Sequence, residues 1–174
     1  MLEINQPGHT PLTVSPLRAD ERIVNYIKGL NYLDDRLSPL FFPLSPDALH
    51  TALPESQRAA VDLIVRQLKR ERSSWFLPII QLAGADVQSK QLIAAHVTAE
   101  LNLRLLRLPA TLMPSQAPEL ETLARLIERE MALWPFAIYI DQEDLEKAAM
   151  KDTGTQSLQR LLTRSNGLFF LDTH

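Results

Sequence analysis

The chain of 174 residues contains no cysteine, which excludes disulfide bonds, thiol catalysis and cysteine-ligated zinc. It also lacks an excess of positive charge. The 18 Lys and Arg residues stand against 21 Asp and Glu, for a net charge of -3, and this balance argues against a nucleic-acid partner. No apolar run approaches the ~20 residues of a membrane-spanning helix, so no membrane association is expected. The first six residues carry neither positive charge nor an apolar core. They are not typical of a signal peptide, and we predict a cytoplasmic protein.

What the chain does contain predicts a globular protein in three parts. Hydrophobic residues make up 45% and charged residues 22%, as in soluble globular domains. Seven of the 12 prolines fall in the first 54 residues, which favours an extended arm over residues 1–17. A helical segment over 18–74 follows, with helices at 20–33 and from Pro54, and an apolar loop at 40–44 pinned against a core. We expect this segment to pack on an α/β domain over 75–174.

The α/β prediction comes from an alternation of apolar runs and helical periodicity. Short apolar runs at 76–82, 103–108, 136–140 and 168–171 alternate with helical patterns at 88–101, 118–134 and 155–164. Such an alternation is typical of a parallel sheet with helices on its faces. In these sheets the ligand crevice lies at the carboxyl ends of the strands, so the residues that follow each strand are the candidate site.

The loop after the first predicted strand partly matches a phosphate-binding motif. It reads Gly84-Ala85-Asp86-Val87-Gln88-Ser89-Lys90-Gln91, against the pattern G-x-x-x-x-G-K-[ST]. The first glycine and the lysine match at the correct separation. Ser89 replaces the second glycine, and its Cβ disfavours a positive φ. Gln91 replaces the magnesium-binding hydroxyl and is a poor ligand for that ion, and Asp86 adds negative charge. In the alternative interpretation, Gly84 is only a turn and Lys90 is a surface lysine.

Two further strand ends carry polar residues. The third predicted strand ends in Asp141, as a Walker B strand does, and Glu143 follows two residues later. The fourth ends at Thr173, a position suited to a sensor of the γ-phosphate. Four scattered histidines do not have the spacing of a helical metal pair, so no metal site is predicted. We interpret Glu128, Arg129 and Glu130 as a solvated helix face.

The glycine loop, acidic strand end and polar strand end together resemble the large subdomain of an AAA+ ATPase, over about residues 75–174. The resemblance implies a P-loop NTPase-like fold, with the first strand beside the fourth and the third beyond it. Residues 21–37 and 103–109 are more specifically similar to the decayed first module of large bacterial ATPases with tandem AAA+ modules. Some of those belong to contractile injection systems. A fifth strand, a helical lid and an arginine finger have no counterpart here, so we expect a truncated subdomain and an N-terminal fragment of a longer protein.

This resemblance predicts a degenerate nucleotide-binding module with an assembly or regulatory role. ATP or ADP would bind weakly, with doubtful help from Mg²⁺, through residues 84–91, Asp141 and Thr173. The partners would be the rest of the parent chain or sister subunits in a ring. Two alternatives stay open at this point. One is a protein-interaction domain that binds no nucleotide. The other is an active ATPase in which Asp141 and Glu143 carry the catalysis.

Overall fold

The computed structural model describes residues 2–4, 17–44, 52–70, 77–141 and 151–173. It divides into two compact units, Met1–Asp34 and Asp35–His174, which are described separately. In the first unit, strands β1 (Leu2–Ile4) and β2 (Leu17–Ala19) pair antiparallel, so the segment predicted as an extended arm includes a strand. Helix α1 (Glu21–Ile27) ends earlier than the predicted residue 33. Gly29, with a φ of +81°, follows the helix and stops it.

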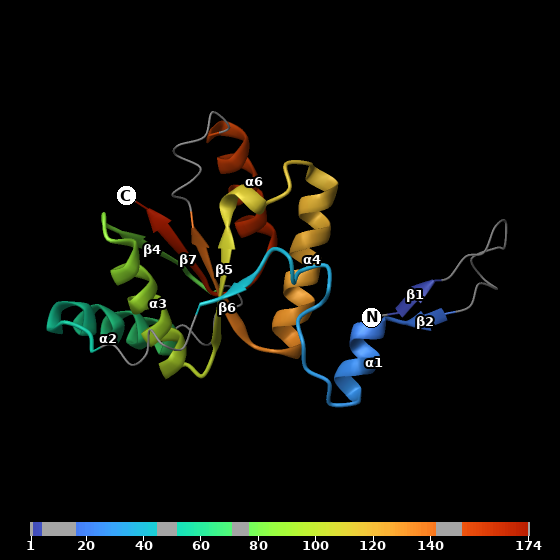
Figure 1. Ribbon diagram of the computed structural model, residues 1–174, viewed down its shortest axis with the longest axis horizontal. Coiled ribbons are helices and arrows are strands. Elements are labelled where there is room, and N and C mark those ends of the chain that lie inside the picture. Colours follow the sequence, from blue (N-terminus) through green and yellow to red (C-terminus); the bar gives the residue numbers. More distant parts are fainter. Residues whose placement is uncertain (1, 5–16, 45–51, 71–76, 142–150, 174) are drawn as a thin grey trace. The chain divides into compact units, whose positions relative to one another are not determined.

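The second unit is built on a five-stranded sheet (Figure 1) with the order β3-β5-β6-β7-β4. Its strands are β3 (Phe42–Pro43), β4 (Ile79–Ala83), β5 (Arg104–Pro109), β6 (Phe136–Asp141) and β7 (Phe169–Thr173). The last four are parallel, and both Ile79 and Ile138 are in register with Phe169. The predicted order, with the first of these strands beside the fourth and the third beyond it, is confirmed. The second unit therefore has an α/β fold with a mainly parallel sheet.

Helices cover both faces of the sheet (Figure 1). Helices α2 (Glu55–Arg70) and α3 (Val87–Glu100) lie on one face, and α4 (Ala117–Leu133) and α6 (Lys151–Arg164) on the other. Val61, Val65 and Leu68 of α2 belong to the same buried cluster as Tyr139 and Phe170 of the sheet. Helix α2 therefore belongs to the core of the second unit. The predicted domain boundaries at 17 and 74 stay predictions, and residues 71–76 lie outside the described residues.

The apolar loop predicted at 40–44 contains a strand that the sequence did not indicate. Phe42 and Pro43 pair antiparallel with Arg107 and Leu106. Phe41 is buried and packs edge-to-face on Phe136, with ring centroids 6.3 Å apart. A strand of two residues is too short to produce an alternating pattern, so the apolar character of the loop was the only available signal.

The predicted solvated face at 128–130 is wrong for Glu130. Its side chain is fully buried, and Arg129 donates to its Oε1 from Nη2 at 2.9 Å. A buried carboxylate needs such a partner because desolvation otherwise penalises its charge. The run of three charged residues on α4 therefore includes a buried ion pair.

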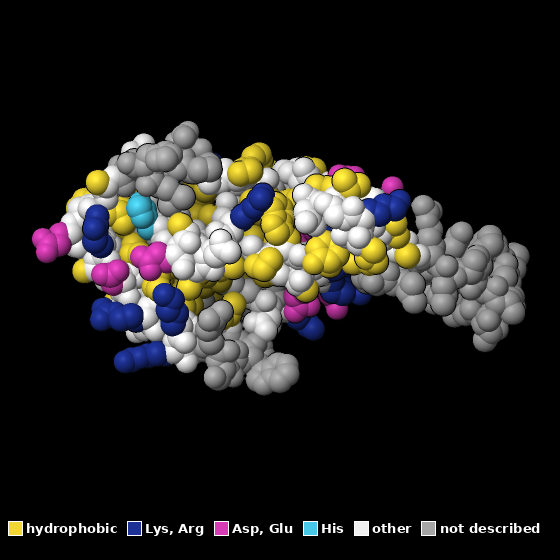
Figure 2. All heavy atoms as spheres, turned by 90° about the horizontal axis from the view of Figure 1, so that it is seen from below, with side chains coloured by type: hydrophobic (Ala, Val, Ile, Leu, Met, Phe, Trp, Pro, Cys, Tyr) yellow, Lys and Arg dark blue, Asp and Glu magenta, His cyan; other side chains and the backbone are white. Residues whose placement is uncertain are grey.

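The surface carries charges of both signs. On the face that Figure 2 shows, Lys and Arg side chains lie among Asp and Glu side chains. In the part of the chain that the structure describes, no helix combines the length and the apolar character needed to cross a bilayer.

Candidate functional site

The connection between β4 and α3 is shorter than the sequence motif suggested. Gly84 follows the strand with a φ of +146°, a conformation that favours glycine, and its N–H donates to the Thr173 carbonyl at 3.1 Å. Because α3 begins at Val87, Val87, Gln88 and Ser89 form the first helical turn. A phosphate-binding loop presents successive backbone N–H groups between strand and helix. Here only residues 84–86 separate the two elements.

Asp86 is the N-cap of α3. Its carboxylate accepts from the Gln88 N–H at 3.1 Å and from the Ser89 hydroxyl at 2.5 Å, and Gln57 of α2 donates to that hydroxyl at 2.9 Å. The hydrogen bond from Ser89 holds the pKa of Asp86 below its usual value, so the side chain is an anion at neutral pH. The positive end of the helix is thus already occupied by a carboxylate of the same chain.

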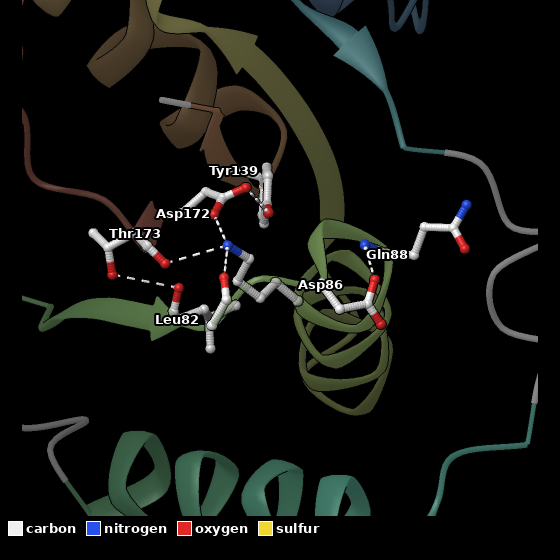
Figure 3. A network of polar contacts seen from close by, with 8 residues as sticks. Leu82, Asp86, Gln88, Tyr139, Asp172 and Thr173 are labelled. Atoms are coloured by element: carbon white, nitrogen blue, oxygen red, sulfur yellow. Dashed lines mark hydrogen bonds and ion pairs between the residues drawn. The ribbon is translucent and has the colours of Figure 1, made fainter. Parts of the chain in front are cut away.

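Lys90 lies in the interior. Its side chain is 4% exposed, and it forms an ion pair with Asp172 of β7. The same ammonium group donates to the Gly84 carbonyl at 2.6 Å and to the Thr173 carbonyl at 3.2 Å, as the dashed lines in Figure 3 show. A lysine has three N–H donors, and these three acceptors match them in number. The alternative interpretation of Lys90 as a surface lysine is wrong.

Asp172 is the residue that sequence reasoning missed. It is buried, and it accepts a hydrogen bond from the Tyr139 hydroxyl of β6 at 2.8 Å. Burial raises the pKa of Tyr139 far above its ordinary value, and the Asp172 carboxylate raises it further. Tyr139 therefore stays protonated and acts as a donor. Lys90, Asp172 and Tyr139 thus form one polar network, and Figure 3 labels the two members that belong to the sheet, Asp172 and Tyr139.

The other predicted site residues have partners of their own. Asp141 is buried at the end of β6, and Arg107 of β5 donates to its Oδ2 from Nε at 3.0 Å and from Nη2 at 2.5 Å. The Thr173 hydroxyl donates to the Leu82 carbonyl at 3.4 Å. Glu143 lies outside the described residues. Within the described ranges, no group of three acidic or histidine side chains could hold a metal ion.

The remaining loop residues are divided between solvent and the helix. Ala85 and Gln88 are exposed, whereas Val87, Ser89 and Gln91 are half-buried in the first turns of α3. The structure thus brings Gly84, Lys90 and Thr173 together through hydrogen bonds. It links Asp141 to Arg107 rather than to any of these. This arrangement does not fit a bound triphosphate, because the lysine donors, the helix terminus and the acidic strand end already have partners.

Two substitutions at Asp86 distinguish the contribution of its N-cap hydrogen bond to stability from the contribution of its charge. We expect Asp86→Ala to lower the free energy of unfolding, because the Gln88 N–H loses its acceptor. Asp86→Asn retains an oxygen that caps the helix, so it should lower the free energy of unfolding much less than the alanine variant does. Urea denaturation of both variants measures the difference. Equal losses in the two variants would contradict the capping role.

Comparison with known proteins gives little sequence similarity. No family model matches the chain, and no curated protein matches it. Among solved structures, the chain is similar to the one described as "Structure of Rhizobiales Trip13", with 15% sequence identity and a TM-score of 0.41. The similarity covers 77% of this chain and 60% of that chain.

Proposed function

We propose that this chain is a degenerate P-loop-type module that serves assembly or regulation and has lost effective nucleotide binding. The observation that supports this function is the environment of Lys90. In a working phosphate-binding loop the lysine contacts the β- and γ-phosphates. Here Lys90 is buried, and its ammonium contacts Asp172 and two carbonyl oxygens of the chain. A phosphate would have to displace these acceptors to reach it.

Two other features support the same proposal. The Asp86 carboxylate caps α3, so an incoming phosphate would meet a negative charge at the helix end. Asp141, which the sequence places at the Walker B position, is bound by Arg107. A magnesium ion would compete with that guanidinium for the carboxylate. The arrangement keeps the fold of the module while its own side chains fill the positions where ligand chemistry is expected.

The resemblance to tandem bacterial ATPases and to contractile injection systems stays a prediction. So does the proposal that the partners are the rest of a parent chain or sister subunits in a ring. A module that keeps its α/β fold without using nucleotide can still present surfaces to other proteins, because fold and activity are separable. A role in assembly or regulation would use such surfaces.

Calorimetric titration of MgATP into the chain tests the proposal. We expect no binding tighter than roughly 100 μM, about -5.5 kcal/mol, and no release of phosphate above background. The matched control is the double variant Lys90→Met with Asp172→Asn, which removes both charges of the buried pair, and circular dichroism checks its fold. The titration should be the same for both proteins. A dissociation constant well below 100 μM that the double variant abolishes would contradict the proposal.

A second candidate function, ATP hydrolysis, rests on Asp141 at the end of β6. Phosphoryl transfer depends mainly on positioning and charge stabilisation, and for this function Asp141 would have to exchange its contact with Arg107 for a magnesium ion. A phosphate-release assay on the unaltered chain and on Asp141→Asn distinguishes this candidate. Turnover that the substitution abolishes would favour hydrolysis over the module proposed above.

A further inference from the structure

Strand β4 is the last strand at its edge of the described sheet, and it pairs with β7. The Gly84 N–H and the Leu82 carbonyl both bond to Thr173 of β7. The backbone groups of even-numbered residues therefore point toward β7. Since adjacent residues of a parallel strand direct their N–H and C=O groups to opposite sides, those of Ile79, Gln81 and Ala83 point outward. This row of groups is a template for another strand.

The residues of this edge lack the usual protection against pairing. Leu77 is 39% and Ile79 43% exposed, Gln81 and Ala83 are exposed, and no charged residue occurs from 77 to 83. Natural sheet edges are commonly protected by charged side chains or proline. Pro78 is an even-numbered residue, so the N–H that it lacks belongs to the side of β7. The backbone N–H groups that point outward, those of Ile79, Gln81 and Ala83, are therefore all present.

We propose that β4 pairs antiparallel with β4 of a second copy of this chain, about a two-fold axis at Gln81. The outward residues are 79, 81 and 83, so an axis at 81 places Gln81 opposite its own copy and Ile79 opposite Ala83. All three pairs are then of the hydrogen-bonded type, which gives about six new N–H···O bonds.

The side chains of the strand are compatible with this self-pairing. A large Ile79 meets a small Ala83, and the two Gln81 amides each offer a donor and an acceptor to the other. Because the strand carries no charge, identical residues meet without the repulsion that penalises like charges directly opposite. A second copy therefore matches the edge in both size and charge.

Cysteine crosslinking tests the pairing and its register, because the natural chain has no cysteine. Residues in a hydrogen-bonded antiparallel pair have Cα atoms ~5.5 Å apart, within the range of a disulfide. We expect Gln81→Cys to form a covalent dimer under mild oxidation. Ile79→Cys alone should not, because its own copy would lie about 13 Å away, four residues along the strand. A mixture of Ile79→Cys with Ala83→Cys should crosslink.

Charge substitutions at the axis supply an independent readout by sedimentation velocity. Gln81→Lys and Gln81→Glu should each be monomeric, and an equimolar mixture of the two should restore the dimer. Gln67→Lys, on the exposed side of α2, adds the same charge elsewhere and should leave the dimer unchanged. A natural chain that stays monomeric at roughly 100 μM, about -5.5 kcal/mol, would overturn the proposal. Crosslinking of Ile79→Cys alone at the yield of Gln81→Cys would overturn the register.

Discussion

Replacing Asp172 by alanine is expected to lower the free energy of unfolding by about 3–5 kcal/mol, the cost of removing one partner from a buried ion pair. The variant leaves the Lys90 ammonium in an interior where its side chain is 4% exposed. It also removes the acceptor of the Tyr139 hydroxyl. A whole domain is stable by only about 5–15 kcal/mol, so a large fraction of the variant should be unfolded near physiological temperature. Guanidinium denaturation followed by circular dichroism measures the loss.

The double variant Lys90→Met with Asp172→Asn is the matched control for this experiment. It contains no unpaired buried charge, and the asparagine oxygen can still accept from Tyr139. We expect it to recover most of the lost stability, since replacing both partners of a buried pair is often nearly neutral. A loss below about 1 kcal/mol for Asp172→Ala would show that the pair is solvated. That result would remove the main support for the proposal that Asp172 takes the place of a phosphate beside Lys90.

The second large effect is expected from Val65→Asp on helix α2. Val65 is 3% exposed and belongs to the cluster that includes Tyr139 and Phe170. An unpaired carboxylate placed there costs several kcal/mol, or it forces the helix away from the sheet. We expect a loss of about 4 kcal/mol or more in the free energy of unfolding. Limited proteolysis should then cleave α2 in the variant, and the same helix should resist cleavage in the natural chain.

Leu63→Asp is the control within the same helix. Leu63 is 52% exposed, so the substitution adds the same charge at the surface. Because leucine is a better helix former than valine, the control carries a larger propensity cost than Val65→Asp, so it does not underestimate that effect. Its effect should stay within about 0.5 kcal/mol. Similar losses for the two variants would contradict the packing of α2 on the sheet. A stable fragment that begins near Trp75 after proteolysis of the natural chain would contradict it as well.

The parallel sheet could be predicted because strands β4, β6 and β7 lie in nearly continuous apolar runs. Strands covered on both faces require that composition, and the run from Phe136 to Ile140 is buried throughout. The element ends were less predictable. Helix α3 begins at Val87 because Asp86 caps it, and this capping role was not visible in a loop that was compared with a phosphate-binding pattern.

The candidate site was only partly predictable for a related reason. Lys90 was identified from its spacing to Gly84, but spacing does not report what the ammonium group contacts. Its partner Asp172 lies 82 residues further along the sequence, and the two meet only because β7 lies beside β4. The predicted strand order is enough to place Lys90 near Asp172. The choice between a phosphate and a carboxylate as the partner of the lysine depends on side-chain geometry.

The short strand β3 makes the two edges of the sheet unequal. It offers two residues on the side opposite β4, and one of them, Pro43, has no N–H to donate. An incoming strand would find too few backbone groups there to form a ladder. If chains join through β4, each joined pair exposes only β3 at both outer margins, so addition ends after one step. The difference in length between the two edge strands thus favours a closed pair of chains over an open-ended fibre.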